Sequence, residues 1–121
     1  MTILDCLVYV PAKDFALSQR FYRALGFTLR PGWGGTMDCE LGAMRFRLQD
    51  YYVAAWAENL MFKIDVDDAR AWHDRVAAVL AGGEFPTARV KPPEEVDDVL
   101  VTHVWDPAGV LLVFVGRGAA A

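Results

Sequence analysis

Few side chains in this 121-residue sequence have the chemistry that catalysis or ligand binding needs. His103 lies in an apolar, strand-like run and is suited to act as a general base or a pH-sensitive ligand contact, since imidazole titrates near neutral pH. No carboxylate or nucleophile is evidently placed to work with it, so we assign no catalytic residue. The alternative for His103 is a hydrogen-bonded position in the wall of a pocket.

A second group of polar side chains alternates with apolar ones in the segment MRFRLQ. Because successive side chains of a strand point to opposite faces, Arg45, Arg47 and Gln49 should share the face opposite the helix. With Asp5 and Tyr9 they predict a polar pocket floor that holds a small anionic or hydrogen-bonding ligand. Alternatively, the two arginines pair with acids across strands or face solvent at a sheet edge.

Aromatic side chains gather in the segment DYYVAAWAENL and in the loop PGWGG. The first segment fits three roles: a ligand lid or stacking wall, a dimer contact, or packing where two halves of the chain meet. Trp33 either closes over a pocket on its glycine-rich loop or is an ordinary anchor, and Trp105 is expected to pack on the face opposite His103. The candidate ligand-binding set is Asp5, Tyr9, Trp33, Arg45, Arg47, Gln49, Tyr52, Trp56 and His103.

Two helices and eight strands are expected to position these residues. Asp14 is suited to cap a helix over 15–25 that Gly26 ends, and Asp67 or Asp68 caps another that runs to about residue 80. Apolar and β-branched runs predict strands at 2–10, 27–30, 36–41, 44–49, 60–66, 84–90, 99–105 and 110–115. Residues 50–59 fit a short helical connector or an irregular arm, 91–98 a solvated loop, and 116–121 a frayed tail.

The same order of elements occurs twice along the chain. A strand, an Asp-capped helix, a glycine and three strands make up residues 1–53 and again residues 54–121. The sequence therefore predicts a single α+β domain, residues 1–121, built from two βαβββ modules. Each sheet has one face under its helix, so the other faces must cover one another or enclose a cavity.

The composition narrows the classes of partner. Apolar residues make up 55% of the chain, enough to fill a core, and the net charge is −4 with no run of Lys or Arg. Nucleic acid and anionic membrane are therefore poor partners, and no apolar stretch approaches the roughly 20 residues of a membrane helix. The start MTILDCLVYV lacks the features of a signal peptide, which favours the cytoplasm, where Cys6 and Cys39 would be buried free thiols.

Three motifs follow one another along the chain. They are the helix segment DFALSQRFYRALGF (residues 14–27), Val66-Asp67-Asp68, and the turn Asp106-Pro107-Ala108-Gly109. Together they resemble the vicinal oxygen chelate superfamily, which includes glyoxalase I, extradiol dioxygenases, and fosfomycin- and bleomycin-resistance proteins. The resemblance spans nearly the whole chain. It implies that the paired modules form a cup-shaped mixed sheet with flanking helices, and that the protein is a homodimer.

Metal-using members of this superfamily carry His, Gln or Glu at a few inward strand positions. The resemblance places those positions at Asp5 (or Leu7 in another register), Met61, Val113, and near Arg47 or Gln49. A divalent ion needs about three or four oxygen or imidazole donors, and methionine and valine cannot replace them. We therefore expect neither a metal ion nor another cofactor.

The favoured function is a metal-independent small-molecule-binding protein, similar to the bleomycin-resistance type, whose ligand the sequence does not identify. Enzymatic activity is the less favoured outcome. One alternative is a metal-dependent lyase, isomerase or dioxygenase of the same superfamily that uses Asp5, Gln49 and His103. The other is a non-catalytic protein whose cup is plugged by its own side chains.

Overall fold

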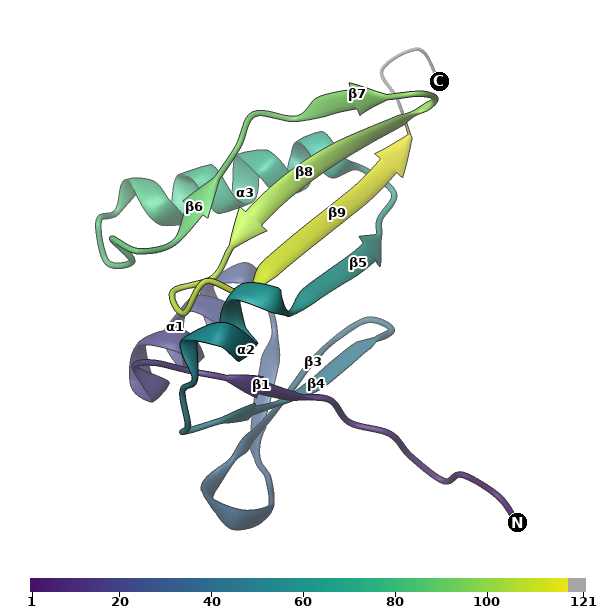
Figure 1. The fold of residues 1–121 in the computed structure, drawn as a ribbon. Helices are drawn as coiled ribbons and strands as arrows, with labels where there is room; N and C mark the ends of the chain where they lie inside the picture. The colour runs from purple at the N-terminus through teal and green to yellow at the C-terminus, as the bar shows by residue number, and fades with distance from the viewer. Residues whose placement is uncertain (118–121) are drawn as a thin grey trace.

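The computed structural model describes residues 1–117 and arranges them in two β-sheets with three α-helices (Figure 1). The first sheet, sheet A, contains β1 (Tyr9–Pro11), β2 (Thr28–Pro31), β3 (Met37–Leu41) and β4 (Met44–Gln49). Its strand order is β1-β4-β3-β2, with β1 parallel to β4 and the other neighbours antiparallel. Helix α1 (Phe15–Leu25) connects β1 to β2, and a short 3-10 turn, η1 (Trp33–Gly35), connects β2 to β3.

The second sheet, sheet B, contains β5 (Met61–Asp65), β6 (Arg89–Val90), β7 (Glu94–Val96), β8 (Val99–Trp105) and β9 (Leu111–Arg117). Its order is β5-β9-β8-β6, β7 also pairs with β8, and β5 runs parallel to β9. The short α2 (Ala54–Asn59) precedes β5, and α3 (Ala69–Ala81) follows it. These mixed sheets and helices confirm the predicted α+β class. The division into modules at residue 53 stays a prediction.

The first predicted strand is much shorter than expected. β1 begins at Tyr9 and not at residue 2. In the segment before β1, the Val8 carbonyl accepts a hydrogen bond from the Arg47 N–H of β4 at 2.9 Å. Apolar, β-branched residues favour a strand, but a strand needs a neighbour to pair with, and residues 1–8 extend away from the folded body (Figure 1).

Other segments also differ from the expected elements. Residues 91–98 were expected to form a solvated loop, but β7 pairs with β8 through a tight turn at Asp97, whose φ is 54°. Aspartate tolerates this left-handed conformation better than most residues, which permits the hairpin. β6 is confined to Arg89–Val90, and the connector at 50–59 contains α2. The expectation of a frayed tail is wrong for Gly116 and Arg117, which pair with β8 as the end of β9, and residues 118–121 lie outside the described residues.

Side-chain caps begin the two long helices at the predicted places. Asp14 accepts from the Leu17 N–H at 3.0 Å, and Asp68 accepts from the Ala71 N–H at 2.9 Å. Each carboxylate satisfies a backbone donor that the first helical turn would otherwise leave unpaired. Gly26 ends α1 with φ at 110°, a conformation that costs glycine little.

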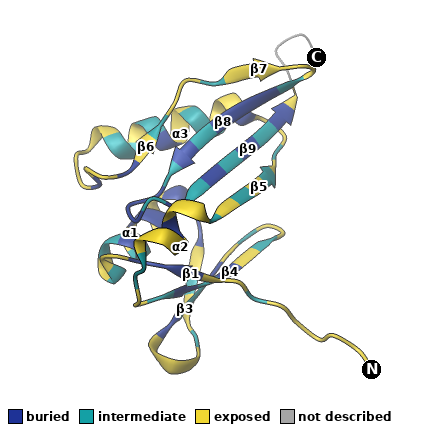
Figure 2. Ribbon diagram, viewed as in Figure 1, coloured by how far each residue is buried: buried dark blue, intermediate teal, exposed yellow. Residues whose placement is uncertain are grey.

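The helices pack on the sheets around a shared core (Figure 2). The buried side chains of α1 are Ser18, Phe21, Tyr22 and Leu25, whereas Leu17 is only half-buried. Aromatic pairs connect the two halves of the chain: Phe21 contacts Phe85 with ring centroids 5.4 Å apart, and Phe46 lies 5.7 Å from Phe62. The core is therefore one body to which both sheets contribute.

A buried hydrogen bond joins the first helix to the last turn of the chain. The Tyr22 hydroxyl donates to Asp106 Oδ2 at 2.6 Å, and both residues are 0% exposed. Asp106 Oδ1 accepts from the N–H groups of Ala108 and Val110 at 2.8 and 3.0 Å, which closes the turn before β9. Burial raises the pKa of Asp106 to about 6, although these hydrogen bonds oppose the shift. Burial, with Asp106 beside it, also raises the pKa of Tyr22 well above its ordinary value.

The two cysteines differ in their environments. Cys39 is buried, and burial raises the pKa of its thiol to about 12. Cys6 is exposed, so the expectation that both thiols are buried is wrong for this residue, because its segment leaves the sheet. None of the described helices has the length and hydrophobicity that crossing a bilayer would require.

Asp106→Asn should change how stability depends on pH. A carboxyl group whose pKa rises from 3.8 to about 6 on folding binds more protons in the folded state, so its contribution to stability falls as pH rises through that range. Relative to the variant, the wild type should lose up to ~3 kcal/mol of unfolding free energy between about pH 4 and pH 7. Urea unfolding of both proteins at several pH values measures this difference.

Tyr22→Phe is the companion variant, since it removes the buried donor and keeps the ring. It should lower the unfolding free energy by about 1–3 kcal/mol at neutral pH, the usual cost of leaving a buried acceptor unpaired.

The prediction for Asp106→Asn would be contradicted if its unfolding free energy differed from that of the wild type by a constant amount from pH 4 to pH 7.

Candidate ligand-binding faces

Each sheet turns one face to the helices and the core and leaves the other open. On β4, Phe46 and Leu48 are fully buried, whereas Arg45, Arg47 and Gln49 alternate with them on the other face. This alternation confirms the predicted orientation of the three polar residues. We call the surface that carries them the open face of sheet A.

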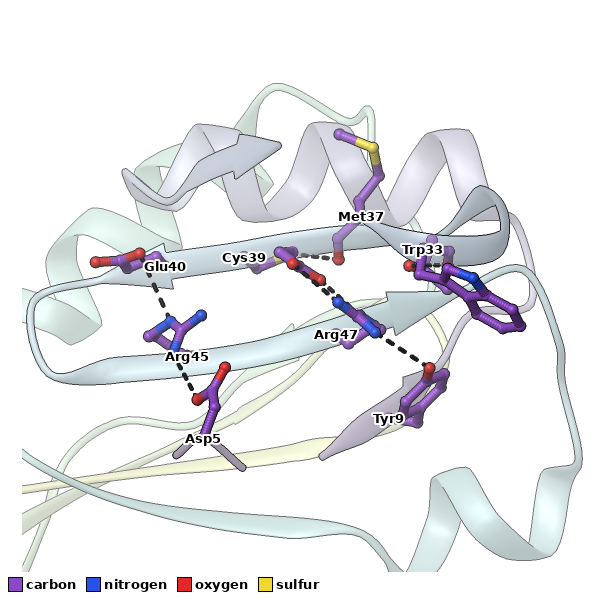
Figure 3. A network of polar contacts seen from close by, with 10 residues as sticks. Asp5, Tyr9, Trp33, Met37, Cys39, Glu40, Arg45 and Arg47 are labelled. Atoms are coloured by element: carbon purple, nitrogen blue, oxygen red, sulfur yellow. Dashed lines mark hydrogen bonds and ion pairs between the residues drawn. The ribbon is translucent and has the colours of Figure 1, made fainter. Parts of the chain in front are cut away.

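Arg47 is the centre of a polar network on this face (Figure 3). Its Nε and Nη2 atoms donate to the two carboxylate oxygens of Asp38 at 2.7 and 3.1 Å, and Nη1 donates to the Tyr9 hydroxyl at 3.3 Å. The register sets these contacts, because Arg47 lies opposite Asp38 of β3 on one side and Tyr9 of β1 on the other. The hydrogen bonds from Arg47 hold the pKa of Asp38 below its ordinary value.

Arg45 is engaged in a similar way on the same face. Its Nη1 donates to Asp5 Oδ1 at 2.9 Å, and its Nε lies 3.7 Å from Glu40 Oε2 (Figure 3). Both arginines therefore pair with acids across strands, which was the alternative to a free anion-binding floor. A ligand anion would have to displace a carboxylate to reach either guanidinium group.

The open face of sheet B is apolar at its centre and basic at one edge. Its register places the side chains in rows across β5, β9, β8 and β6. One row is Met61, Leu111, Trp105 and Arg89, and the next is Lys63, Val113, His103 and Lys91. The residues that alternate with these on β9, Leu112 and Phe114, are buried on the opposite side.

Trp105 lies in a stacked cluster on this face. The Arg89 guanidinium carbon is 4.4 Å from the centroid of the Trp105 ring, and the Lys91 ammonium nitrogen is 5.7 Å from it. The His103 ring is 6.2 Å from the Trp105 ring and inclined to it by 22°. The expectation that these two rings lie on opposite faces is wrong, because side chains two positions apart on a strand share a face.

His103 carries one polar atom without a visible partner. Its Nδ1 is buried and forms no hydrogen bond within residues 1–117. Buried polar groups in folded proteins nearly always have a partner, so such an atom requires an explanation. A water molecule or a bound ligand would supply one.

The residues at the metal positions of the superfamily do not fit a metal ion. Asp5 is held by Arg45, and Met61 and Val113 offer no carboxylate or imidazole. In the part of the chain that the structure describes, no three His, Cys, Asp or Glu side chains converge in a way that would hold an ion.

The predicted aromatic residues lie on connecting segments. Trp33 in η1 is 79% exposed, and Trp56 of α2 is exposed and lies 5.7 Å from the Tyr51 ring. Tyr52 is half-buried against the core. The structure thus brings Asp5, Tyr9 and the arginines of sheet A together and places Trp33 beside that network (Figure 3). It places His103 on the other sheet. Tyr52 and Trp56 lie on the segment between the two sheets.

A cavity of about 550 Å³ lies where the β3–β4 turn meets β5 and the start of α3. Its apolar lining includes Leu41, Met44, Phe62, Ile64 and Trp72, and none of the predicted site residues. Sequence reasoning missed this cavity because its walls come from both halves of the chain. Each lining residue, taken alone, has the pattern of an ordinary core position, so the sequence carries no separate signal for it.

Arg47→Gln should raise the pKa of Asp38, because the substitution removes the hydrogen bond that is the main cause of the lowered value. Carboxyl-carbon chemical shifts in an NMR pH titration measure this pKa. The stability that the pair contributes is present above the ordinary pKa of aspartate and is lost as the pH falls through the lowered value. The destabilisation caused by Arg47→Gln should therefore shrink in acid.

Arg45→Gln is the matched control for this prediction. Arg45 is the weakest of the causes that act on Asp38, so its loss should move the pKa of Asp38 less than the loss of Arg47 does. Equal shifts from the two variants would mean that general positive charge, and not the paired hydrogen bonds, sets the titration of Asp38.

Solved structures share this architecture. A bleomycin-binding protein from Streptomyces verticillus, in complex with copper(II)-bleomycin, has a TM-score of 0.75 at 22% identity, with 98% of each chain covered. The bleomycin resistance determinant encoded on transposon Tn5 has a TM-score of 0.74 at 20% identity, covering 93% of this chain and 97% of the other. A lactoylglutathione lyase from Agrobacterium tumefaciens has a TM-score of 0.66 at 15% identity, with 95% of each chain covered.

These comparisons establish the fold and leave the activity open. No protein-family model and no curated protein matches the sequence. The structural relatives include both bleomycin-binding proteins and a lyase, and one fold hosts many chemistries. The chain has the fold of the vicinal oxygen chelate superfamily, as its sequence motifs predict.

Proposed function

We propose that the protein binds a small organic molecule against the open face of sheet B, without a metal ion, and that it does so as a homodimer. The observation that carries the proposal is the surface itself. Leu111 and Val113 form an apolar centre, and the rings of Trp105 and His103 stack next to it with their centroids 6.2 Å apart. An apolar surface with a few convergent polar groups is the usual composition of a small-molecule site.

Binding is better supported than catalysis by the arrangement of the polar groups. Arg45 and Arg47 are held in ion pairs, and the Nδ1 atom of His103 has no carboxylate partner within the described residues. A general base normally needs a partner that orients it, and a hydrolytic or isomerising site needs an electrophile or a metal ion. The names of two proteins with this fold, a bleomycin-binding protein and a resistance determinant, also favour a binding role.

Small aromatic compounds should stabilise the protein against heat. A ligand at a hundred times its Kd adds about 2.7 kcal/mol to the unfolding free energy, which is several degrees of Tm in a chain of this size. Differential scanning fluorimetry with a library of acidic, neutral and basic aromatic compounds measures the shift. Trp105→Leu should reduce it, whereas Tyr51→Leu, which removes an exposed ring on a connecting segment, should not.

Manganese, nickel, iron and zinc ions belong in the same assay, because the lyase, isomerase or dioxygenase alternative requires one of them. A metal-dependent rise in Tm that Asp5→Asn abolishes would favour that alternative. The absence of any stabilising compound across the library would contradict a binding role and would favour a plugged, non-catalytic protein.

The apolar segment at residues 2–8, which is exposed in the single chain, supports the proposed homodimer. Ile3 and Leu4 are 87% and 92% exposed, and Val8 is 46% exposed. The segment protrudes from the body of the molecule (Figure 1). Extended chain with exposed aliphatic side chains readily pairs with a strand edge of another molecule. A second copy is therefore a suitable partner for residues 2–8.

The outer edge of β5 is a suitable place for that segment to dock. β5 ends the strand order of sheet B, so within residues 1–117 it has a neighbour on one side only. The cavity lies beside it, with Phe62 and Ile64 in its wall. Val10 points into the core, and alternation puts Leu4 and Val8 on the same side of the extended chain. We infer that these side chains from a second copy cover the cavity.

Leu4→Asp should convert the dimer into a monomer, since it places a charge on the proposed apolar contact without disturbing a residue that the single chain buries. Size-exclusion chromatography with light scattering measures the mass across a dilution series. Val96→Asp is the matched control, because Val96 is, like Leu4, an exposed aliphatic residue, and it lies on β7, far from the segment in sequence. A wild-type protein with the mass of one chain at every concentration would contradict the proposal.

A further inference from the structure

The basic side chains of the two open faces differ in what they contact. On sheet A, Arg47 and Arg45 contact carboxylate oxygens at 2.7 and 2.9 Å. On sheet B, Arg89 and Lys91 form no ion pair among the described residues and contact the ring of Trp105 instead. The second pair of cations is therefore available to a ligand without the displacement of an acid.

The strand register places the positive charges of Arg89 and Lys91 at the same end of the two side-chain rows that contain Trp105 and His103. Arg89 lies opposite Trp105, and the Lys91 N–H donates to the His103 carbonyl, so both cations stand on the same edge of the face. The row beyond them ends in Glu94, which lies opposite Val101. The chain as a whole carries a net charge of −4, so the basic edge is a local arrangement and not a consequence of composition.

The contact between Arg89 and Trp105 leaves the guanidinium group able to bind an anion. Arginine that stacks on an aromatic ring keeps its N–H groups in its own plane, where they can form two parallel hydrogen bonds to a carboxylate. The indole also holds the guanidinium in place, which reduces the entropy lost when a ligand binds. Lys91 adds a second positive charge at 5.7 Å from the same ring.

The neighbouring residues suit a flat, apolar group. The rings of His103 and Trp105 are inclined by only 22°, and Leu111 and Val113 lie beside them in the same rows. A planar ring system on this floor would bring an attached acid to the basic edge.

We propose that the ligand is a planar aromatic carboxylate, an inference that rests on the proposed function and names its ligand class. The rings lie on the apolar floor beside Trp105, and the carboxylate accepts hydrogen bonds from Arg89 and Lys91. Neutral and cationic molecules of the same shape bind more weakly, because they leave both cations without a counter-charge.

Three compounds of one shape test the charge preference: 2-naphthoate, 2-naphthamide and 2-naphthylmethylammonium. Isothermal titration calorimetry at low and moderate salt should give 2-naphthoate at least about tenfold tighter binding than the amide, as one charge-assisted pair of hydrogen bonds would supply. Amide chemical shifts in an NMR titration should change most along β8, β9 and β6.

The double variant Arg89→Gln with Lys91→Gln should abolish the preference, so that 2-naphthoate and 2-naphthamide bind it with affinities within about twofold of each other, because the cations that distinguish a carboxylate from an amide are gone. The matched control is Arg20→Gln with Arg70→Gln, which removes the same charge from exposed positions on α1 and α3. It should keep the tenfold preference.

The possible outcomes separate this inference from the proposed function. Binding of the amide or the ammonium compound as tightly as 2-naphthoate would overturn the inference and leave the binding function standing. A preference for 2-naphthoate that both double variants reduce equally would show an effect of net charge and would also overturn it. If neither these three compounds nor the wider library binds, the proposed function fails and the inference with it.

Discussion

The hydrogen bond from Tyr22 to Asp106 ties the first half of the chain to the second in a place that water does not reach. Tyr22 belongs to the helix that covers sheet A, and Asp106 holds the turn from which β9 runs through sheet B. Loss of the donor would leave a buried carboxylate underpaired, which is why the contact matters more than its modest net energy suggests. The apolar floor of the proposed site begins at Leu111, directly after this anchored turn.

The division of charge between the two open faces follows from strand register. On sheet A, neighbouring strands put acids opposite arginines, as Asp38 lies opposite Arg47 and Glu40 opposite Arg45. Those guanidinium groups organise the face and are already satisfied. On sheet B, the neighbour of Arg89 is an aromatic ring, so its charge is stabilised but not neutralised. The same residue type therefore has a structural role on one sheet and is suited to ligand binding on the other.

The residue type at position 113 affects what the centre of the sheet B face can hold. By the sequence resemblance, Val113 stands where metal-using members of the superfamily carry a glutamate, and it lies in the centre of the sheet B face beside His103. A carboxylate there would need a cation as partner, whereas valine gives a surface on which a flat molecule can pack. The shared fold permits both arrangements, because it fixes where a side chain points and not which side chain stands there.

Local patterns in the sequence determined the helices and most of the strands. They also determined the alternation that puts Arg45 and Arg47 on one face of β4. Helix caps and side-chain periodicity depend on residues only a few positions apart, so a short segment is enough to specify them. The same patterns overextended the first strand, since a strand exists only where a neighbour pairs with it. The tertiary structure decided the rest: the pairing of Arg47 with Asp38, the contact of Arg89 with the Trp105 ring, and the position of the cavity. Those contacts join strands through their register, and register depends on how the whole core packs, so no single segment encodes it.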